Sequence, residues 1–483
     1  MKNLISLISL FLINMLVHVH GQNDPLLRHA MVTVNPVPDY EVFAPSPIPD
    51  RIVLTWSDNP ANTQTVTWRT DISVERAFGQ IAISTSGPLF RDETIYATTR
   101  SLETNLGKAN YHSVLFKNLE PDTRYIYRVG DGMNWSEWIE FKTASNTFEP
   151  FTFIYMGDSQ EDVRSQWSRV VRNAFRDAPE SRFFLHAGDL VDNAHNDGEW
   201  GEWFEAQGFI PRMTPVIPVT GNHEHHGRLS DQWRYQFNLP ENGPEELLGS
   251  TYYIDVQNVR IIVLNSSMHL SRYQGSLHNL EMDYIQNVQT NWLKKVLEQN
   301  NSRWTIVAFH HPPYPSQRGR LNKEIYDQWK PIFETYNVDL VLNGHEHSYY
   351  RTNSQRKDGI SDSSDTKLEN DSENDGGTVY VVSHSGSKTR KLNREDWMVR
   401  AGEDIQLFHT VRVEEEKIHF ESKTATGKIY DAFTILKKDN NPNVIIDRIP
   451  SLEEMLRGED SILPETLRPW FYHERRFVDP PRR

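Results

Sequence analysis

The sequence predicts two folded domains in tandem, an all-β sandwich followed by an α/β domain built in layers. Between residues 50 and 145, short alternating segments such as RIVLTW and QTVTWRT are separated by turn residues, as in antiparallel sheets. Between residues 150 and 438, apolar strand-like segments alternate with helical segments, which indicates sheets covered by helices. A chain of 483 residues has ample length for both cores.

The first 21 residues have the pattern of a signal peptide. An almost wholly apolar run from Leu4 to Val17 follows a positively charged start, and Gly21 suits a cleavage site before Gln22. The run is shorter than the ~20 apolar residues that a membrane span requires. We therefore expect a secreted or periplasmic protein with no stable membrane insertion, and a polar, proline-rich linker over residues 22–49.

The segment from Leu119 to Val129, LEPDTRYIYRV, has the form of a tyrosine corner. In this feature of fibronectin type III sandwiches, a tyrosine at a sheet crossing bonds through its hydroxyl group to the backbone upstream. We therefore expect residues 50–145 to form a fibronectin III-like domain. Trp56 and Trp68 lie in alternating segments and are expected to be core aromatics.

In the second domain, five apolar segments each end in a short polar motif. The segments are FTFIYMGD, RFFLHAGD, TPVIPVTGNHE, WTIVAFHH and VDLVLNGHEH. Each begins as a buried strand, so the polar residues fall at strand ends, where loops can converge: Asp158, Asp189, Asn222, His310, His345 and His347. Two divalent cations need a shared carboxylate plus nitrogen and oxygen ligands, and this set supplies both. The sequence thus predicts a binuclear metal site for phosphate chemistry.

Helices and further strands complete this domain. Helical patterns occur in four segments, over residues 165–178, 200–207, 284–299 and 322–336. An acidic stretch over residues 354–377, rich in serine, aspartate and asparagine, is expected to be a disordered insertion. Strand patterns then return and close the domain near residue 438. The tail, residues 439–483, ends in a basic and aromatic segment whose docking site the sequence leaves open.

The composition excludes several kinds of partner. With 51 basic and 66 acidic residues the formal charge is 51 − 66 = −15, so a non-specific grip on nucleic acid is not expected. The chain has no cysteine, which excludes disulfides and thiolate metal sites. A small phosphorylated substrate remains compatible with an acidic chain, because bound metals reverse the field locally. The oligomeric state is left open.

The motifs GD, GD, GNHE, VxxH and GHxH, in this order, resemble those of the calcineurin-type metallophosphoesterases. With the sandwich in front, the chain resembles the purple acid phosphatases in particular, from about residue 50 to 438. The resemblance implies a layered α/β/β/α sandwich and two divalent or trivalent metal ions, Fe, Zn or Mn. It implies the following ligand roles: Asp189 bridging both metals, Asp158 and His347 completing the first, and Asn222, His310 and His345 binding the second.

The resemblance also implies in-line displacement at phosphorus by a metal-bound hydroxide, with His223 protonating the leaving group. We expect a secreted hydrolase of phosphate monoesters. A phosphodiesterase or nucleotidase is the alternative within enzymes, because the same metal cluster serves both ester types. Two other hypotheses carry less weight: a binding protein without activity, and a sugar-binding sandwich with exposed aromatics at Trp135 and Trp138.

Two positions depart from the purple acid phosphatases. Asp192 stands where that family has the tyrosine that binds ferric iron and gives the colour, which argues against a fixed ferric site; binding of the metal by Asp192 itself is the alternative. Gln160 stands where the purple enzymes have glycine and many relatives have a metal-binding histidine. Direct ligation by Gln160 and a supporting hydrogen bond both remain possible, although neutral amides are poor ligands for Zn or Fe.

Several further residues near the motifs receive weaker assignments. Adjacent side chains on extended backbone point to opposite sides, so His311 is expected to point away from the site of His310. His225 is expected to be a surface loop histidine. Arg318 and Arg320 are expected to be solvated loop charges, with a phosphate clamp as the alternative.

Overall fold

The computed structural model describes residues 37–225, 228–270, 279–317, 319–352, 377–438 and 443–456. The predicted signal peptide, most of the linker, nearly all of the acidic insertion and much of the tail lie outside these residues. The chain divides into two units, residues 1–44 and residues 45–483. In the described part of the first unit the regular element is the short helix α3 (Asp39–Val42). All elements below belong to the second unit.

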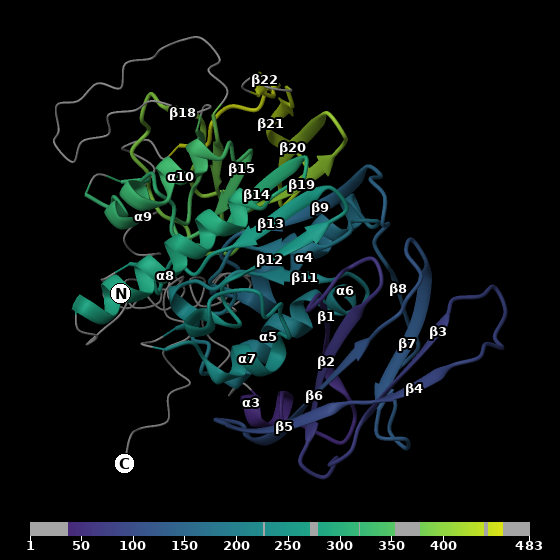
Figure 1. The fold of residues 1–483 in the computed structure, drawn as a ribbon. Helices are drawn as coiled ribbons and strands as arrows, with labels where there is room; N and C mark the ends of the chain where they lie inside the picture. The colour runs from purple at the N-terminus through teal and green to yellow at the C-terminus, as the bar shows by residue number, and fades with distance from the viewer. Residues whose placement is uncertain are drawn as a thin grey trace, which may run out of the picture. The chain divides into compact units, whose positions relative to one another are not determined.

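The first domain is a sandwich of two four-stranded sheets with antiparallel pairing, drawn in purple and blue in Figure 1. The first sheet has the order β1-β2-β6-β5 and the second β4-β3-β7-β8. The strands are β1 (Asp50–Thr55), β2 (Gln64–Asp71), β3 (Phe78–Ile83), β4 (Glu93–Tyr96), β5 (Thr98–Thr104), β6 (Gly107–Phe116), β7 (Arg124–Gly130) and β8 (Ile139–Lys142). The predicted all-β sandwich is confirmed.

The tyrosine corner is present in the sandwich. The hydroxyl oxygen of Tyr125 accepts a hydrogen bond from the backbone N–H of Glu120 at 2.8 Å. Trp68 is buried in the sandwich core, as predicted. Trp56 is also buried, but it packs edge-on against Phe183 of the second domain, with ring centroids 5.7 Å apart. Trp68 therefore packs in the sandwich core, and Trp56 packs at the contact between the two domains.

The second domain is built on two seven-stranded sheets. The first has the order β11-β10-β9-β19-β20-β21-β22, and the second β12-β13-β14-β15-β17-β16-β18. Their strands are β9 (Phe151–Met156), β10 (Phe184–His186), β11 (Val216–Pro218), β12 (Tyr252–Val256), β13 (Val259–Val263), β14 (Trp304–Ala308), β15 (Leu340–Asn343), β16 (Tyr349–Thr352), β17 (Val379–Val382), β18 (Met398–Gly402), β19 (Leu407–Val413), β20 (Lys417–Thr424), β21 (Ile429–Leu436) and β22 (Val444–Asp447). The sheet thus continues into β22, beyond the end of the domain expected near residue 438.

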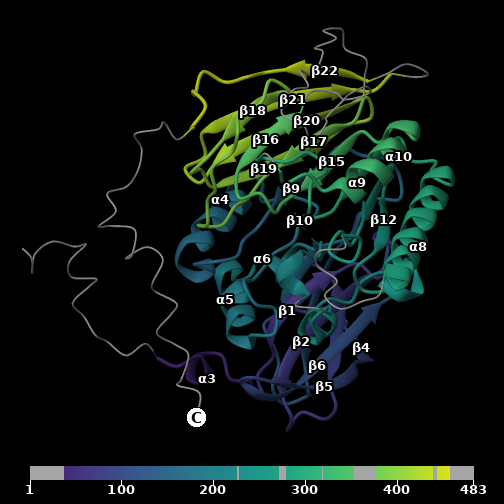
Figure 2. The ribbon, with the colours of Figure 1, turned by 90° about the vertical axis from the view of Figure 1, so that its left-hand side faces the viewer.

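Helices and short helical turns accompany the two sheets. They are the π-helical turn η1 (Val163–Trp167), α4 (Ser168–Asp177), α5 (Asp197–Gln207), α6 (Ile210–Met213), the 3₁₀ turn η2 (Asn222–Glu224), α7 (Asp231–Gln236), the 3₁₀ turn η3 (Glu245–Leu247), α8 (Asn279–Glu298), α9 (Lys323–Gln328) and α10 (Lys330–Thr335). Figure 2 shows α4 and α5 on one side of the paired sheets and α8, α9 and α10 on the other. The α/β/β/α layering is therefore confirmed.

The central strands are buried on both faces, which explains their nearly continuous apolar sequences. Every residue of β13 and β14 is buried. One large core cluster combines strands of both sheets with residues of α4 and α5, and a second joins the sheet of β14 to α8 and α9. In the described ranges, no helix is both long enough and apolar enough to span a membrane.

A buried ion cluster joins the sandwich to the second domain. Asp197, the first residue of α5, is fully buried and accepts hydrogen bonds from Nη1 of Arg51 in β1 and from Nη1 of Arg69 in β2, the latter at 2.8 Å. Its backbone N–H donates to Oδ1 of Asn105 at 2.7 Å. Because the loop that carries Asp189 runs directly into α5, these contacts hold one end of that loop in place.

Candidate metal centre

The six predicted ligands follow the carboxyl ends of five strands. Asp158 follows β9, Asp189 follows β10 and Asn222 follows β11, three strands that run parallel in the first sheet. His310 follows β14, while His345 and His347 follow β15, which is parallel to β14 in the second sheet: these loops bring donors from both sheets together.

Four of these residues have left-handed backbone conformations, which L side chains adopt at a cost and which cluster at functional sites. The φ angles are +34° at Asp158, +51° at Asp189, +75° at His345 and +52° at His347. These bends turn the side chains inward directly after each strand.

Two glycines allow the loops to approach closely. A Cβ atom on Gly221 would lie 2.0 Å from Oδ1 of Asp189, and one on Gly344 would lie 2.4 Å from Oδ2 of Asp158. No larger side chain fits at either position while the carboxylates keep their places. The glycines of the GNHE and GHEH motifs are therefore required by the packing of the ligand loops.

The ligand atoms lie close together and are buried. Nε2 of His310 lies 2.9 Å from Oδ2 of Asp189 and 3.9 Å from Oδ1 of Asp158. Nε2 of His347 lies 3.6 Å from Oδ1 of Asp158, and Nδ1 of His345 lies 3.3 Å from Nε2 of His310. The structure thus brings both carboxylates and all three predicted histidines into one cluster.

Two oxygens of the cluster accept no hydrogen bond. Oδ1 of Asp158 and Oδ1 of Asn222 are buried without a partner among the described residues. Burying an acceptor in this way is costly unless another group satisfies it. Carboxylate and amide oxygens beside imidazole nitrogens are ligands of Zn, Fe and Mn. The unsatisfied atoms therefore fit a pair of such cations.

Backbone carbonyls orient the ring nitrogens. The Nδ1–H of His310 donates to the carbonyl oxygen of Ala187 at 2.8 Å, and that of His347 donates to the carbonyl of Lys388 at 2.9 Å. A proton on Nδ1 leaves the lone pair on Nε2, which faces the cluster in both residues. Hydrogen bonds of this kind commonly fix the tautomer of a metal-binding histidine.

The buried charges of the protein without metal also favour the binding of cations. Burial raises the pKa of Asp158 to about 8. Burial would lower the pKa of His310, but Asp189 and Asp158 outweigh it and raise that pKa to about 9. Burial would raise the pKa of Asp189, but His310 and His223 hold it well below its usual range. The imidazolium of His310 thus neutralises the buried carboxylate of Asp189, and a metal ion would replace its proton.

A buried glutamate that sequence reasoning missed ties two of the ligand loops together. Oε2 of Glu224 accepts hydrogen bonds from the backbone N–H groups of Asp189 at 3.0 Å and Gly221 at 2.6 Å, and Oε1 accepts from that of Leu190 at 2.8 Å. Burial and the nearby Asp189 raise its pKa to about 7. The available signal was its place in the GNHE motif, two residues after the ligand Asn222.

His223 lies at the edge of the cluster, partly exposed. Its backbone N–H donates to Oδ1 of Asp189 at 3.0 Å, and its Nδ1–H donates to the carbonyl oxygen of Asp192 at 2.5 Å. Nε2 lies 3.8 Å from Oδ2 of Asp189. Burial would lower its pKa, but Asp189 and Asp192 raise it above the ordinary value. The two aspartates therefore favour the protonated form of this imidazole, which lies beside Asp189.

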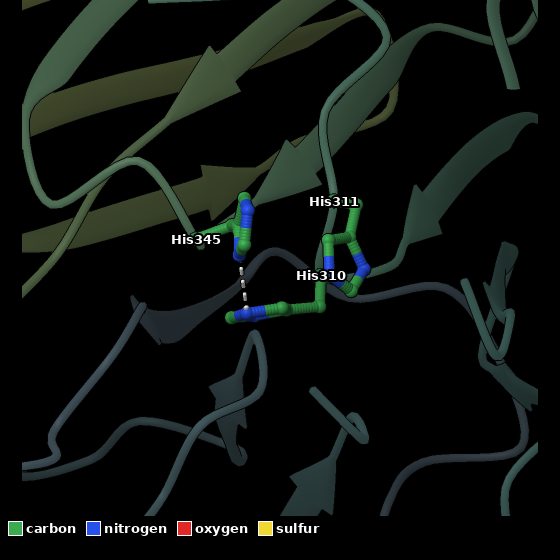
Figure 3. Close-up of side chains that lie close together, drawn as sticks. All are labelled: His310, His311 and His345. Carbon is green, nitrogen blue, oxygen red and sulfur yellow. Dashed lines mark hydrogen bonds between the residues drawn. The ribbon is translucent and has the colours of Figure 1, made fainter. Parts of the chain in front are cut away.

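The expectation for His311 was wrong. Its ring lies beside those of His310 and His345, with centroids 4.8 and 4.3 Å away (Figure 3). The strand β14 ends at Ala308, so the two histidines lie beyond the regular strand, where its alternation of side chains no longer holds. Its Nδ1 lies 2.8 Å from Oγ of Ser266, which holds the ring in this position.

Two other expectations also need correction. His225 is buried rather than on the surface, with Nδ1 2.8 Å from the carbonyl oxygen of Gly221 and Nε2 3.0 Å from Nδ2 of Asn265. Arg320 is not a solvated charge, because its Nη2 lies 3.1 Å from Nε2 of His345. Arg318 lies outside the described residues.

The two positions that depart from the purple acid phosphatases differ in their placement. Gln160 is fully buried among the ligands. Asp192 lies outside the cluster, about a third exposed, with Oδ1 3.5 Å from Nδ1 of His223 and 4.0 Å from Nζ of Lys388.

Comparison with known families matches both domains. Residues 49–143 match the purple acid phosphatase N-terminal domain, and residues 151–349 match the calcineurin-like phosphoesterases. The chain is 26% identical over 336 residues to human acid phosphatase type 7, which covers 64% of this chain and 72% of that protein. It is 25% identical over 355 residues to a purple acid phosphatase of Glycine max, covering 69% and 72%.

A third relative is the Fe(3+)-Zn(2+) purple acid phosphatase 12 of Arabidopsis thaliana, 26% identical over 343 residues, with 65% and 68% covered. Among solved structures, the purple acid phosphatase PPD1 from yellow lupin seeds is similar with a TM-score of 0.65 at 16% identity, covering 81% of this chain and 75% of that one. This structure supports the fold alone.

The fold and the matched domains define the chain as a calcineurin-type metallophosphoesterase, a metal-dependent phosphatase. Its N-terminal domain matches that of the purple acid phosphatases and its relatives include them, so within this class the chain resembles the purple acid phosphatases. The cofactor of this class, a pair of metal ions from among Fe, Zn and Mn, fits the donor set of the cluster.

Proposed function

We propose that this protein is a secreted phosphatase that hydrolyses phosphate monoesters at a binuclear metal centre. The main support is the buried pairing of Asp189 with His310 beside the unsatisfied oxygens of Asp158 and Asn222. The six ligands would divide as follows: Asp189 shared by both ions, Asp158 and His347 on the first, and Asn222, His310 and His345 on the second.

Two cations bound at these residues would polarise the phosphoryl oxygens and lower the pKa of a water molecule. The protein itself provides orientation and a proton. The hydrogen bond from Nδ1 of His223 to the carbonyl oxygen of Asp192 turns Nε2 toward the side of Asp189. A proton on Nε2 is then available to the departing alkoxide, a role worth about 10²–10⁴-fold in rate.

Cationic side chains around the cluster favour a monoester over a diester. Nη2 of Arg320 lies 3.1 Å from Nε2 of His345, and Nη1 of Arg390 lies 3.5 Å from the carbonyl oxygen of His345. Nζ of Lys388 lies 4.0 Å from Oδ1 of Asp192, beside His223. A monoester carries up to two negative charges on phosphorus and a diester carries one, so these cations stabilise the monoester more.

The substrate assignment is tested with two chromogenic esters. The metal-loaded protein should hydrolyse p-nitrophenyl phosphate with a higher kcat/KM than bis(p-nitrophenyl) phosphate, whether loaded with Zn²⁺, Mn²⁺ or iron. Replacing Arg390 by alanine should reduce hydrolysis of the monoester more than that of the bis-ester. A preference for the bis-ester with every metal would instead support the phosphodiesterase or nucleotidase alternative.

Secretion is proposed from the first 21 residues, which lie outside the described residues. Fractionation of the producing cells should place the protein outside the cytoplasm, and sequencing of the mature protein should begin at Gln22. Recovery of an uncleaved chain from the cytoplasm would contradict this part of the proposal. Absence of bound metal from protein purified in its native compartment would favour the binding-protein hypothesis.

A further inference from the structure

Gln160 lies inside the metal centre and has no assigned role. It follows Asp158 by two residues, on the loop after β9, and its side chain is fully buried. Its Nε2 lies 3.4 Å from Nε2 of His347 and 3.3 Å from Nε2 of His223. Its Oε1 is buried and accepts no hydrogen bond among the described residues. A buried amide with one unsatisfied end is costly unless a further group satisfies it.

The tautomers of the two histidines explain the position of the amide nitrogen. Both Nδ1 atoms donate to backbone carbonyls, His223 to that of Asp192 and His347 to that of Lys388. In the neutral rings the lone pairs are therefore on Nε2, and the NH₂ group of Gln160 donates toward both. On His347 this is the lone pair that a metal ion would take.

A metal ion at His347 therefore excludes the NH₂ group from its present position, because the amide hydrogens carry a partial positive charge and a cation repels them. A half-turn of the amide about its last bond exchanges the two ends and brings Oε1 to the same place. The oxygen that is unsatisfied in the protein alone would then face the ion. The shape of the site needs no change for this exchange, since the two ends of the amide have nearly the same size.

The carboxylate of Asp192, the other candidate ligand at this end of the cluster, does not face the ligand atoms. Asp192 lies outside the cluster and faces Nδ1 of His223 and Nζ of Lys388. Lys388 also pairs with Glu161 at 2.5 Å, which holds this group of charges at the surface of the site. Of Gln160 and Asp192, the two residues near the metal motifs that depart from the purple acid phosphatases, Gln160 is the one that points at the ligand atoms.

We propose that Oε1 of Gln160 is a ligand of the metal ion held by Asp158 and His347, an inference that rests on the proposed binuclear function. The protein ligands of that ion then carry the charge of Asp158 and a share of that of Asp189, while Gln160 and His347 are neutral. This ligand set matches a divalent ion and lacks the anionic oxygen that would favour a trivalent one. The ion held by Asp158, His347 and Gln160 is therefore divalent.

The test is metal binding to the full mature chain, measured with Mn²⁺ alone. Metal-free wild type and Gln160→Ala protein are titrated with Mn²⁺, and free Mn²⁺ is followed by its electron paramagnetic resonance signal. We expect two sites in the wild type, and in Gln160→Ala one site unchanged and one weakened by about tenfold or more. Gln160→Glu, which keeps an oxygen at this position and adds a charge, should bind the weakened ion at least as tightly as the wild type.

Asp192→Ala is the matched control. It changes the other position that departs from the purple acid phosphatases, and it should leave both Mn²⁺ affinities unchanged. Equal affinities in wild type and Gln160→Ala, or a weakened site in Asp192→Ala alone, would overturn the assignment of Gln160. If Gln160→Ala does not fold, weaker binding by Gln160→Glu than by wild type would overturn it equally. Failure of the wild type itself to bind two ions would instead reject the binuclear function.

Discussion

His310 and Asp189 form a buried pair, with Nε2 of the histidine 2.9 Å from Oδ2 of the aspartate and neither side chain exposed beyond 1%. The same carboxylate accepts, through Oδ1, the backbone N–H of His223. One aspartate therefore organises a histidine from each of two loops, and in the protein without metal the proton on His310 provides a positive charge beside the carboxylate of Asp189.

Asp189→Asn should abolish metal binding and catalysis together. The substitution keeps the size of the side chain but removes the charge that the proposed assignment shares between the two ions, a charge expected to provide several kcal/mol of stabilisation, or about 10³-fold in rate. The measurements are metal content by mass spectrometry and turnover of p-nitrophenyl phosphate. Two ions per chain and undiminished turnover in this variant would show that the cluster is not the catalytic centre.

His223→Asn should separate proton donation from metal binding. We expect unchanged metal content and a loss of about 10²–10⁴-fold in kcat for an alkyl phosphate, whose leaving group needs a proton. The loss should be much smaller for p-nitrophenyl phosphate, because its leaving group is stable as an anion. An equal loss with both substrates would argue against the role as a proton donor.

The sequence could predict much of the centre because the information was local. Each ligand directly follows an apolar strand segment, and parallel strands bring their carboxyl ends to one edge of a sheet, as Asp158 and Asp189 show. The tyrosine corner at Tyr125 was likewise visible in one short segment. Strand patterns and turn chemistry are properties of neighbouring residues, so both domains could be predicted.

The residues that sequence reasoning missed depend on backbone bends and on contacts between distant segments. The direction of His311 could not be predicted, because it requires knowing that β14 ends at Ala308. Glu224 could not be distinguished from a surface acid without the N–H groups that bond to it. The burial of Asp197 depends on arginines more than a hundred positions away, which no local pattern reveals.

Asp197→Ala should destabilise the protein strongly without touching the metal ligands. It leaves Arg51 and Arg69 buried without their shared partner, and breaking a buried ion pair in this way costs about 3–5 kcal/mol. The free energy of unfolding, from urea denaturation of the chelated protein, measures this cost. Asp50→Asn is the control, since Asp50 also pairs with Arg69 but is more than a third exposed, and it should cost under about 1 kcal/mol.

The free energy of unfolding should fall in acid because of His112 in the sandwich. This histidine is fully buried in β6 with its ring nitrogens 2.7 and 2.9 Å from the hydroxyl oxygens of Thr70 and Thr99, and burial lowers its pKa to about 4. In the unfolded chain the pKa is about 6.5, so the unfolded state binds a proton first as the pH falls. Above that pH the ring is neutral in both states and the full free energy of unfolding is present. As the pH falls from about 6.5 toward 4, proton binding by the unfolded chain lowers the free energy of unfolding.

Between pH 7.5 and pH 5, the proton on the unfolded chain should therefore cost the wild type about 2 kcal/mol of unfolding free energy through His112. His112→Gln keeps a polar side chain of similar length with no titration in this range, so its stability should fall by that much less over the same interval. Urea denaturation of both chelated proteins at the two pH values measures the difference. Parallel losses in wild type and His112→Gln would mean that the ring is protonated in the folded sandwich or does not control its acid stability.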